Sequence, residues 1–249
     1  MKFKFILALT AICAASAMAQ SKPPGFDIAG IRFGMSPAEV RAAMKAYDSK
    51  MKIEDFAKYR GSDNGTPSSL ASITGKGSDK SIGDFFVEFG QFDQKLYRIE
   101  RKSVKMTSMR QSTLNESLLN KYKFNIKDIS AYTPTNSTNW WEWAYKPDGT
   151  FEVGKPSTSD DPMFKGRKTY ECPMPSDHTA RKGCGVTVEL HMMSATRSGV
   201  ELNENFEITA LDHSIMYDNG KKSNDASAAF ELAKKRGMEE KSKSVSPKL

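Results

Sequence analysis

Four acidic and imidazole side chains in the last third of the chain have the spacing that acid–base or metal chemistry needs. Glu189 and His191 are two residues apart, so on a β-strand they share one face. Asp212 and His213 follow on the segment expected to form the neighbouring strand. Suitable pairing would bring carboxylates and imidazoles together, as in a metal-dependent or acid–base hydrolase. The alternative is that these histidines are scattered on half-exposed strands without a shared role.

The rest of the sequence does not strengthen the enzymatic interpretation. The chain has three histidines, and it contains no H-E-x-x-H, G-x-S-x-G or glycine-rich phosphate-binding sequence. We therefore predict a protein that is not an enzyme, with no catalytic residues, no metal site and no cofactor. The hydrolase remains the competing interpretation.

Residues 140–145, W-W-E-W-A-Y, suggest a binding site instead. On a strand, Trp141, Trp143 and Tyr145 share one face. If that face is exposed, it could stack on sugars or contact a protein, because aromatic side chains dominate interface hot spots. If it is buried, it lines the core of a sheet. Both interpretations stay open, and the three residues are the candidate binding surface.

The N-terminal residues have the pattern of an export signal. Lys2 and Lys4 precede an apolar run at residues 5–15 and then small residues, so cleavage is expected after Ala19. The run is shorter than the ~20 apolar residues that span a bilayer. We expect a periplasmic or secreted protein without an integral membrane segment.

Cys13 lies in the expected signal peptide and would be removed with it, which leaves Cys172 and Cys184. Export makes a disulfide the expected state of these two cysteines. The bond would close a surface loop that is rich in proline and glycine. A catalytic thiol or a Cys/His metal site with His178 is the alternative, but the C-x-x-C spacing is missing.

The net charge of +7 does not indicate a nucleic-acid-binding protein. Residues 20–220 contain 27 basic and 26 acidic residues, whereas residues 221–249 contain eight and four. A nucleic-acid-binding domain shows its basic surface in the folded part. We expect no nucleic acid as a partner, because the excess charge lies in the C-terminal tail.

The clearest structural pattern starts a helix. Ser36-Pro-Ala-Glu39 is a capping box, with Pro37 at the first helical position, and Met35 and Val40 form a hydrophobic staple. A strand is expected before it, over residues 26–33. The pattern favours a joint between strand and helix over a catalytic site.

Other segments predict further strands and helices. A second capping box, Thr113-Leu-Asn-Glu116, begins 77 residues after the first. Two tandem helix-plus-sheet modules would explain this spacing. Strands are expected at residues 70–73, 85–89, 96–100, 140–145, 150–153, 186–192 and 206–216, and helices at 113–122 and 225–236.

The run Ile28-x-Gly30-Ile31-x-x-Gly34-Met35-Ser36-x-x-Glu39-Val40 resembles the G-M-[ST]-x-x-[EQ]-V segment of exported bacterial envelope proteins. These include the SmpA/BamE outer-membrane assembly lipoproteins and the β-lactamase inhibitor proteins. The resemblance implies helix-on-antiparallel-sheet modules and a function in binding proteins.

We therefore predict an α+β fold with helices packed on one face of an antiparallel sheet and one disulfide. The expected divisions are a signal peptide (1–19), two α+β modules (20–108 and 109–220), a C-terminal helix (221–237) and a disordered tail (238–249). The predicted function is that of a non-enzymatic binding or inhibitor-like envelope protein, with another envelope protein as the expected partner. Cell-wall glycan is the second candidate partner.

Overall fold

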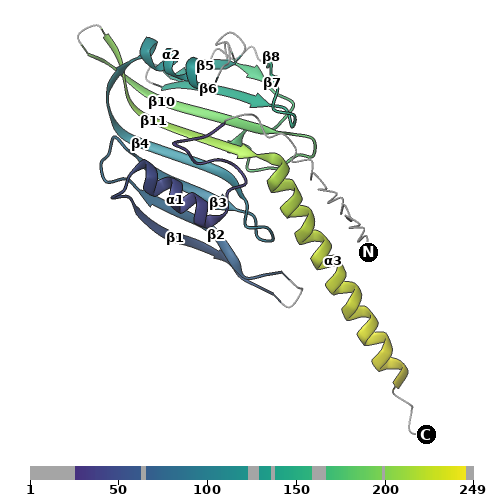
Figure 1. Ribbon diagram of the computed structural model, residues 1–249. Coiled ribbons are helices and arrows are strands. Elements are labelled where there is room, and N and C mark those ends of the chain that lie inside the picture. The colour runs from purple at the N-terminus through teal and green to yellow at the C-terminus, as the bar shows by residue number, and fades with distance from the viewer. Residues whose placement is uncertain are drawn as a thin grey trace, which may run out of the picture.

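The computed structural model describes residues 26–62, 66–122, 129–135, 138–158, 167–197 and 200–244. The protein is α+β, with a large antiparallel sheet and a long C-terminal helix that projects away from it (Figure 1). The described helices are α1 (Pro37–Tyr47), α2 (Gln111–Tyr122), α3 (His213–Ser244) and the short 3-10 helix η2 (Pro175–Asp177). Among these helices, none is both long and apolar enough to cross a membrane.

The sheet runs in the order β1-β2-β3-β4-β11-β10-β6-β5, with β7 beside β6. Its central pair is β4 and β11, so two segments that are far apart in the sequence lie side by side in the middle of the sheet. The strands are β1 (Lys52–Tyr59), β2 (Ser69–Lys76), β3 (Asp84–Phe89), β4 (Leu96–Arg110), β5 (Ser130–Thr135), β6 (Thr138–Tyr145), β7 (Phe151–Glu152), β10 (Val186–Arg197) and β11 (Val200–Asp212). A separate small pair consists of β8 (Lys155–Pro156) and β9 (Lys168–Thr169).

The start of α1 matches the sequence prediction. The Ser36 hydroxyl accepts a hydrogen bond from the Glu39 amide, and the Glu39 carboxylate accepts one from the Ser36 amide at 2.8 Å. Gly34 has a φ of 77°, which a glycine adopts without strain. Its amide donates to the Leu96 carbonyl at 2.8 Å, so the joint is anchored to the start of β4.

Residues 26–33 form a tight turn and not the predicted strand. Ile28 and Ile31 exchange two backbone hydrogen bonds across Ala29 and Gly30, both of which have positive φ. The Asp27 carboxylate accepts from the Gly30 amide at 2.8 Å and stabilises the turn. The apolar residues Phe26, Ile28, Ile31 and Phe33 are all buried, and the turn interrupts their alternation between Ile28 and Ile31.

Two further boundaries differ from prediction. Helix α2 begins at Gln111, so Thr113 lies inside the helix, where its carbonyl accepts from Ser117, and it is not an N-cap. Helix α3 starts at His213 and continues through Gly237 to Ser244. One glycine costs about 1 kcal/mol in a helix, which does not break so long a segment. The predicted strand to residue 216 and the disordered tail from 238 are therefore wrong where α3 covers them.

The two predicted hairpins are present. Strands β3 and β4 pair around residues 90–95, and β6 pairs with β7 around Lys146 and Gly149. In the second turn the Gly149 amide donates to the Lys146 carbonyl at 2.9 Å, and Gly149 has a φ of 84°. Strand β4 extends to Arg110, so it runs through the predicted module boundary at residue 108.

Strand register defines two faces of the sheet. One row across the strands joins Gly75, Phe85, Arg101, Ile208, Leu190 and Trp141. A Cβ atom on Gly75 would lie 2.9 Å from the sulfur of Met44, so α1 packs on this side, which we call the core face. The neighbouring row on the opposite side, the polar face, joins Glu54, Thr74, Phe86, Glu100, Thr209, Glu189 and Glu142.

Candidate functional site on the polar face of the sheet

The aromatic residues of β6 lie in the core. Trp141, Trp143 and Tyr145 are 5%, 0% and 8% exposed, because they point to the core face. Trp143 lies 5.6 Å from the ring of Tyr122 of α2. The interpretation of this stripe as an exposed binding surface is therefore wrong, since a partner at the surface cannot reach these side chains.

The four residues of the proposed hydrolase do not form one site. Asp212 pairs in register with Val186, which places it on the core face, whereas Glu189 and His191 lie on the polar face. Asp212 caps α3 by accepting from the amides of Ser214 and Ile215. In the described residues, no three His, Cys, Asp or Glu side chains are grouped so that they could bind a metal ion.

The two histidines have separate partners. The ring of His191 stacks on Trp140, with 3.7 Å between centroids. The Nε2 atom of His213 is 2.9 Å from the Thr187 hydroxyl, and the residue is fully buried. Burial lowers the pKa of both imidazoles. These contacts explain the histidines as structural residues.

The segment closed by the disulfide covers one half of the polar face. Cys172 and Cys184 are bonded as predicted, with Cα atoms 5.5 Å apart. Between them, the Ser176 hydroxyl and amide donate to the Glu189 carboxylate at 2.6 and 3.1 Å. Glu142 lies opposite Glu189 in the ladder and pairs with Arg167 at 3.4 Å. This covered half is a buried polar layer in which Glu189 is bonded to Ser176 and Glu142 is paired with Arg167.

Glu189 should make stability depend on pH. Burial, with a smaller contribution from nearby Glu142, raises the pKa of Glu189 to about 7 despite the two bonds from Ser176. The ordinary value is 4.5, so between these pH values the folded state binds more protons than the unfolded state. The contribution of protonated Glu189 to the free energy of unfolding is thus present below pH 4.5 and is lost as the pH rises through 7.

The Glu189→Gln variant removes this titration. From low to neutral pH, we expect its free energy of unfolding to rise relative to wild type by up to about 3 kcal/mol. Urea denaturation at several pH values measures the difference. Glu171→Gln, at an exposed carboxylate of the same region, is the matched control and should keep the wild-type profile. Parallel wild-type and Glu189→Gln profiles would contradict the prediction.

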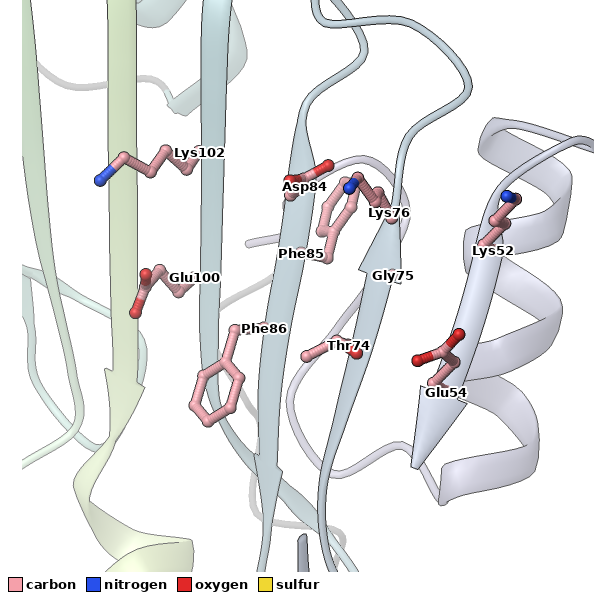
Figure 2. Close-up of a pocket in the computed structure, with 10 residues that line it drawn as sticks. All are labelled: Lys52, Glu54, Thr74, Gly75, Lys76, Asp84, Phe85, Phe86, Glu100 and Lys102. Carbon is pink, nitrogen blue, oxygen red and sulfur yellow. The ribbon is translucent and has the colours of Figure 1, made fainter. Parts of the chain in front are cut away.

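The other half of the polar face, over β1–β4, is open. A shallow pocket of about 340 Å³ lies there, and Figure 2 shows its side chains on four neighbouring strands. They are Lys52 and Glu54 of β1, Thr74 and Lys76 of β2, Asp84 and Phe86 of β3, and Glu100 and Lys102 of β4, with Gly75 and Phe85 completing the lining. We call the side chains of these strands that lie on the polar face, together with Phe56, the open face, which excludes Gly75 and Phe85 of the core-face row.

Two adjacent rows on the open face differ in charge. One row carries Lys52, Lys76 and Lys102 together with Asp84, which lies opposite Lys102, and the other row carries Glu54 and Glu100. Lys102 pairs with Glu207 at 3.0 Å, and Glu100 pairs with Arg98 at 3.2 Å. No ion pair joins Lys52, Lys76 or Glu54 to another described residue, so these three charges point to solvent at the edge of the sheet.

An aromatic pair lies next to these charges. Phe56 of β1 packs edge-on against Phe86, with 5.6 Å between ring centroids. Phe56 is 67% exposed, the largest value among the described large apolar side chains. The guanidinium of Arg98, held by Glu88 and Glu100, lies 6.0 Å from the Phe86 ring. Phe86 is thus fixed in place, while Phe56 is presented to solvent.

The sequence interpretation missed this surface because it assigned no strand to residues 52–59. Strand β1 is an edge strand exposed on both faces, so its apolar residues do not alternate clearly. The alternation of Lys52, Glu54 and Phe56 is a weak indication that could have suggested a strand with an outward-facing aromatic residue.

Comparison of the chain with protein-family models, with curated proteins and with solved structures yields no match.

Proposed function

We propose that the chain is an exported, non-enzymatic binding protein that holds another envelope protein on its open face. The observation that carries this proposal is Phe56, which lies 67% exposed against a fixed aromatic ring and beside unpaired lysines. Edge strands normally avoid exposed aromatic residues, because these favour unwanted association. An exposed phenylalanine at this place is therefore explained by a partner.

The open face has the composition of a protein interface. Interface hot spots combine an aromatic anchor with a rim of charged residues that excludes water. Here Phe56 and Phe86 are the anchor, and Lys52, Lys76 and Glu54 lie around it. The partner that fits is a folded protein that presents an apolar side chain to Phe56 and a carboxylate to the two lysines, since opposite charges set orientation and association rate.

We also propose that the fold consists of two modules. In sequence order, one helix and four strands of the large sheet come first (α1, β1–β4). A second helix and four more strands of the same sheet follow (α2, β5, β6, β10, β11). Across the sheet, the first set of strands lies in chain order and the second set lies in the reverse of chain order. Met44 of α1 and Tyr122 of α2 contact the same sheet face, which supports helices on one side of the sheet, while the half of the other side over β1–β4 is free.

The resemblance of residues 28–40 to exported envelope proteins supports the proposed location. The disulfide supports it as well, because such bonds persist in oxidising compartments such as the periplasm. We propose cleavage after Ala19, which puts the open face in contact with envelope proteins.

Site-specific photocrosslinking in living cells tests the function. A photoreactive phenylalanine analogue at position 56 should give one discrete protein adduct of defined mass. The charge-reversing double variant K52E/K76E should reduce that adduct at least tenfold, because a carboxylate on the partner would then be repelled.

Val153 provides the matched control position, since it is 61% exposed and lies outside the open face. The same analogue at position 153 should give no adduct of that mass. Equal adducts at both positions, or none at position 56, would overturn the proposal. Retention on purified peptidoglycan that is lost on Phe56→Ala would overturn it in favour of a glycan partner.

A further inference from the structure

Arg101 is a charged residue in an apolar row of the core face. Its neighbours in register are Phe85 on β3 and Ile208 on β11, both of them buried. Its guanidinium lies 4.9–5.5 Å from the ring centres of Tyr47, Phe85 and Phe206. A guanidinium taken out of water among rings is costly unless an anion accompanies it.

The described residues accept hydrogen bonds from only some of the N–H donors of this guanidinium. Its Nε and Nη2 atoms donate to the Ile82 carbonyl at 3.3 and 2.9 Å, and Nη2 also donates to the Tyr47 hydroxyl. No described carboxylate pairs with Arg101, and no hydrogen bond joins its Nη1 atom to the described residues. The remaining donors of this fork could bind a carboxylate.

A cavity of about 280 Å³ lies beside Arg101. Its apolar walls include Leu190, Met192 and Ile208, which belong to the central strands. Lys121 of α2 is the second cation on its lining, and it pairs with Asp27 at 3.2 Å. An open pocket with apolar walls and cations on its lining is complementary to an apolar molecule that carries one negative group.

We propose that this cavity binds a single-chain carboxylate amphiphile, a fatty acid, with its carboxylate on Arg101 and its chain against Leu190, Met192 and Ile208. The size favours one chain, because small-molecule sites span about 300–1,000 Å³ and this cavity, at about 280 Å³, falls just below that range. The site is on the face opposite to the proposed partner surface and does not rest on that proposal.

Calorimetric titration of the full chain with laurate, below its micelle concentration, tests the proposal. We expect saturable binding of about one laurate per chain. Dodecanol has the same chain without the charge, and acetate has the charge without the chain, so both should bind at least tenfold more weakly. Equal affinity for laurate and dodecanol, or no saturable laurate binding, would overturn the proposal.

Variants of two neighbouring residues distinguish binding at this site from non-specific attraction of an anion to a basic protein. Arg101→Gln should weaken laurate binding at least tenfold. Lys102→Gln removes one charge from the next residue, whose side chain lies on the opposite face, and should leave the affinity unchanged. Equal affinities for these two variants would refute the site.

Lys121→Gln keeps the test valid if Arg101→Gln does not fold, because Lys121 is on an exposed helix position. It should weaken laurate binding several-fold, and an unchanged affinity would count against the proposed head-group position. Binding to vesicles of anionic phospholipid that survives Arg101→Gln, without laurate binding, would replace the proposal by a surface interaction with membranes.

Discussion

Replacing Trp143 with alanine is expected to lower the free energy of unfolding by about 3–5 kcal/mol. The side chain is fully buried, it contacts Tyr122, and it is paired across the sheet with Val188. Removing the indole leaves a cavity that the neighbouring strands β6 and β10 cannot close, because their backbones are held by the ladder. Urea denaturation followed by far-ultraviolet circular dichroism measures the loss.

The neighbouring Trp140 is the matched control for this variant. It lies on the other face of β6, is partly exposed and stacks on His191. Trp140→Ala should cost about 1–2 kcal/mol, clearly less than Trp143→Ala. A Trp143→Ala protein with wild-type stability would contradict the assignment of Trp143 to the core.

Removing the disulfide is the second change with a large expected effect. The Cys172→Ser, Cys184→Ser double variant should lose about 3 kcal/mol, which is the chain-entropy value for a loop of this length. The loop covers Glu189 through Ser176, so its release also exposes the buried carboxylate. Hydrogen exchange should therefore increase at the Ser176 and Glu189 amides.

Reduction of the wild-type protein provides the control for the double variant. Wild type in a thiol reductant and the double variant should unfold at the same urea concentration, since both lack the same bond. The double variant should not change further when reductant is added. A double variant as stable as the oxidised wild type would show that the loop is held by Glu189 and its other contacts alone.

Local sequence patterns predicted the local structures well. The capping box, the proline and Gly34 give the start of α1, because each interaction joins residues within a few positions. The turn at Lys146 and Gly149 was predictable for the same reason. The cysteine pair was predictable from the number of cysteines and the expected compartment.

Some sequence patterns are compatible with two different local structures, and these patterns led to wrong predictions. Residues 26–33 alternate only loosely, since a strand would place Ile28 and Ile31 on opposite faces, whereas the turn between them buries both. Thr113 and Glu116 have capping-box spacing, but α2 gains its first turn from Gln111 and starts earlier. The length of α3 was underestimated at both ends, because the helix was expected to begin only at residue 225 and to end at Gly237.

The candidate site was not predictable from spacing. Glu189 and Asp212 are on adjacent strands, but the register places them on opposite faces, and a shift of one residue would have reversed that result. The aromatic stripe on β6 could have been core or surface, and the choice depended on which side of the sheet receives the helices. Phe56 became visible as a site only when β1 was found at an edge of the sheet.

The sequence by itself therefore determined the helix joint, the hairpin turns, the α+β class and the disulfide partners, since these depend on residues close together or on composition. The tertiary structure alone decided that the tryptophans are core, that Glu189 is buried with a raised pKa, and that the open face and the Arg101 cavity exist. The physical reason is that exposure and pairing in a sheet depend on long-range strand order and register, which local patterns do not encode.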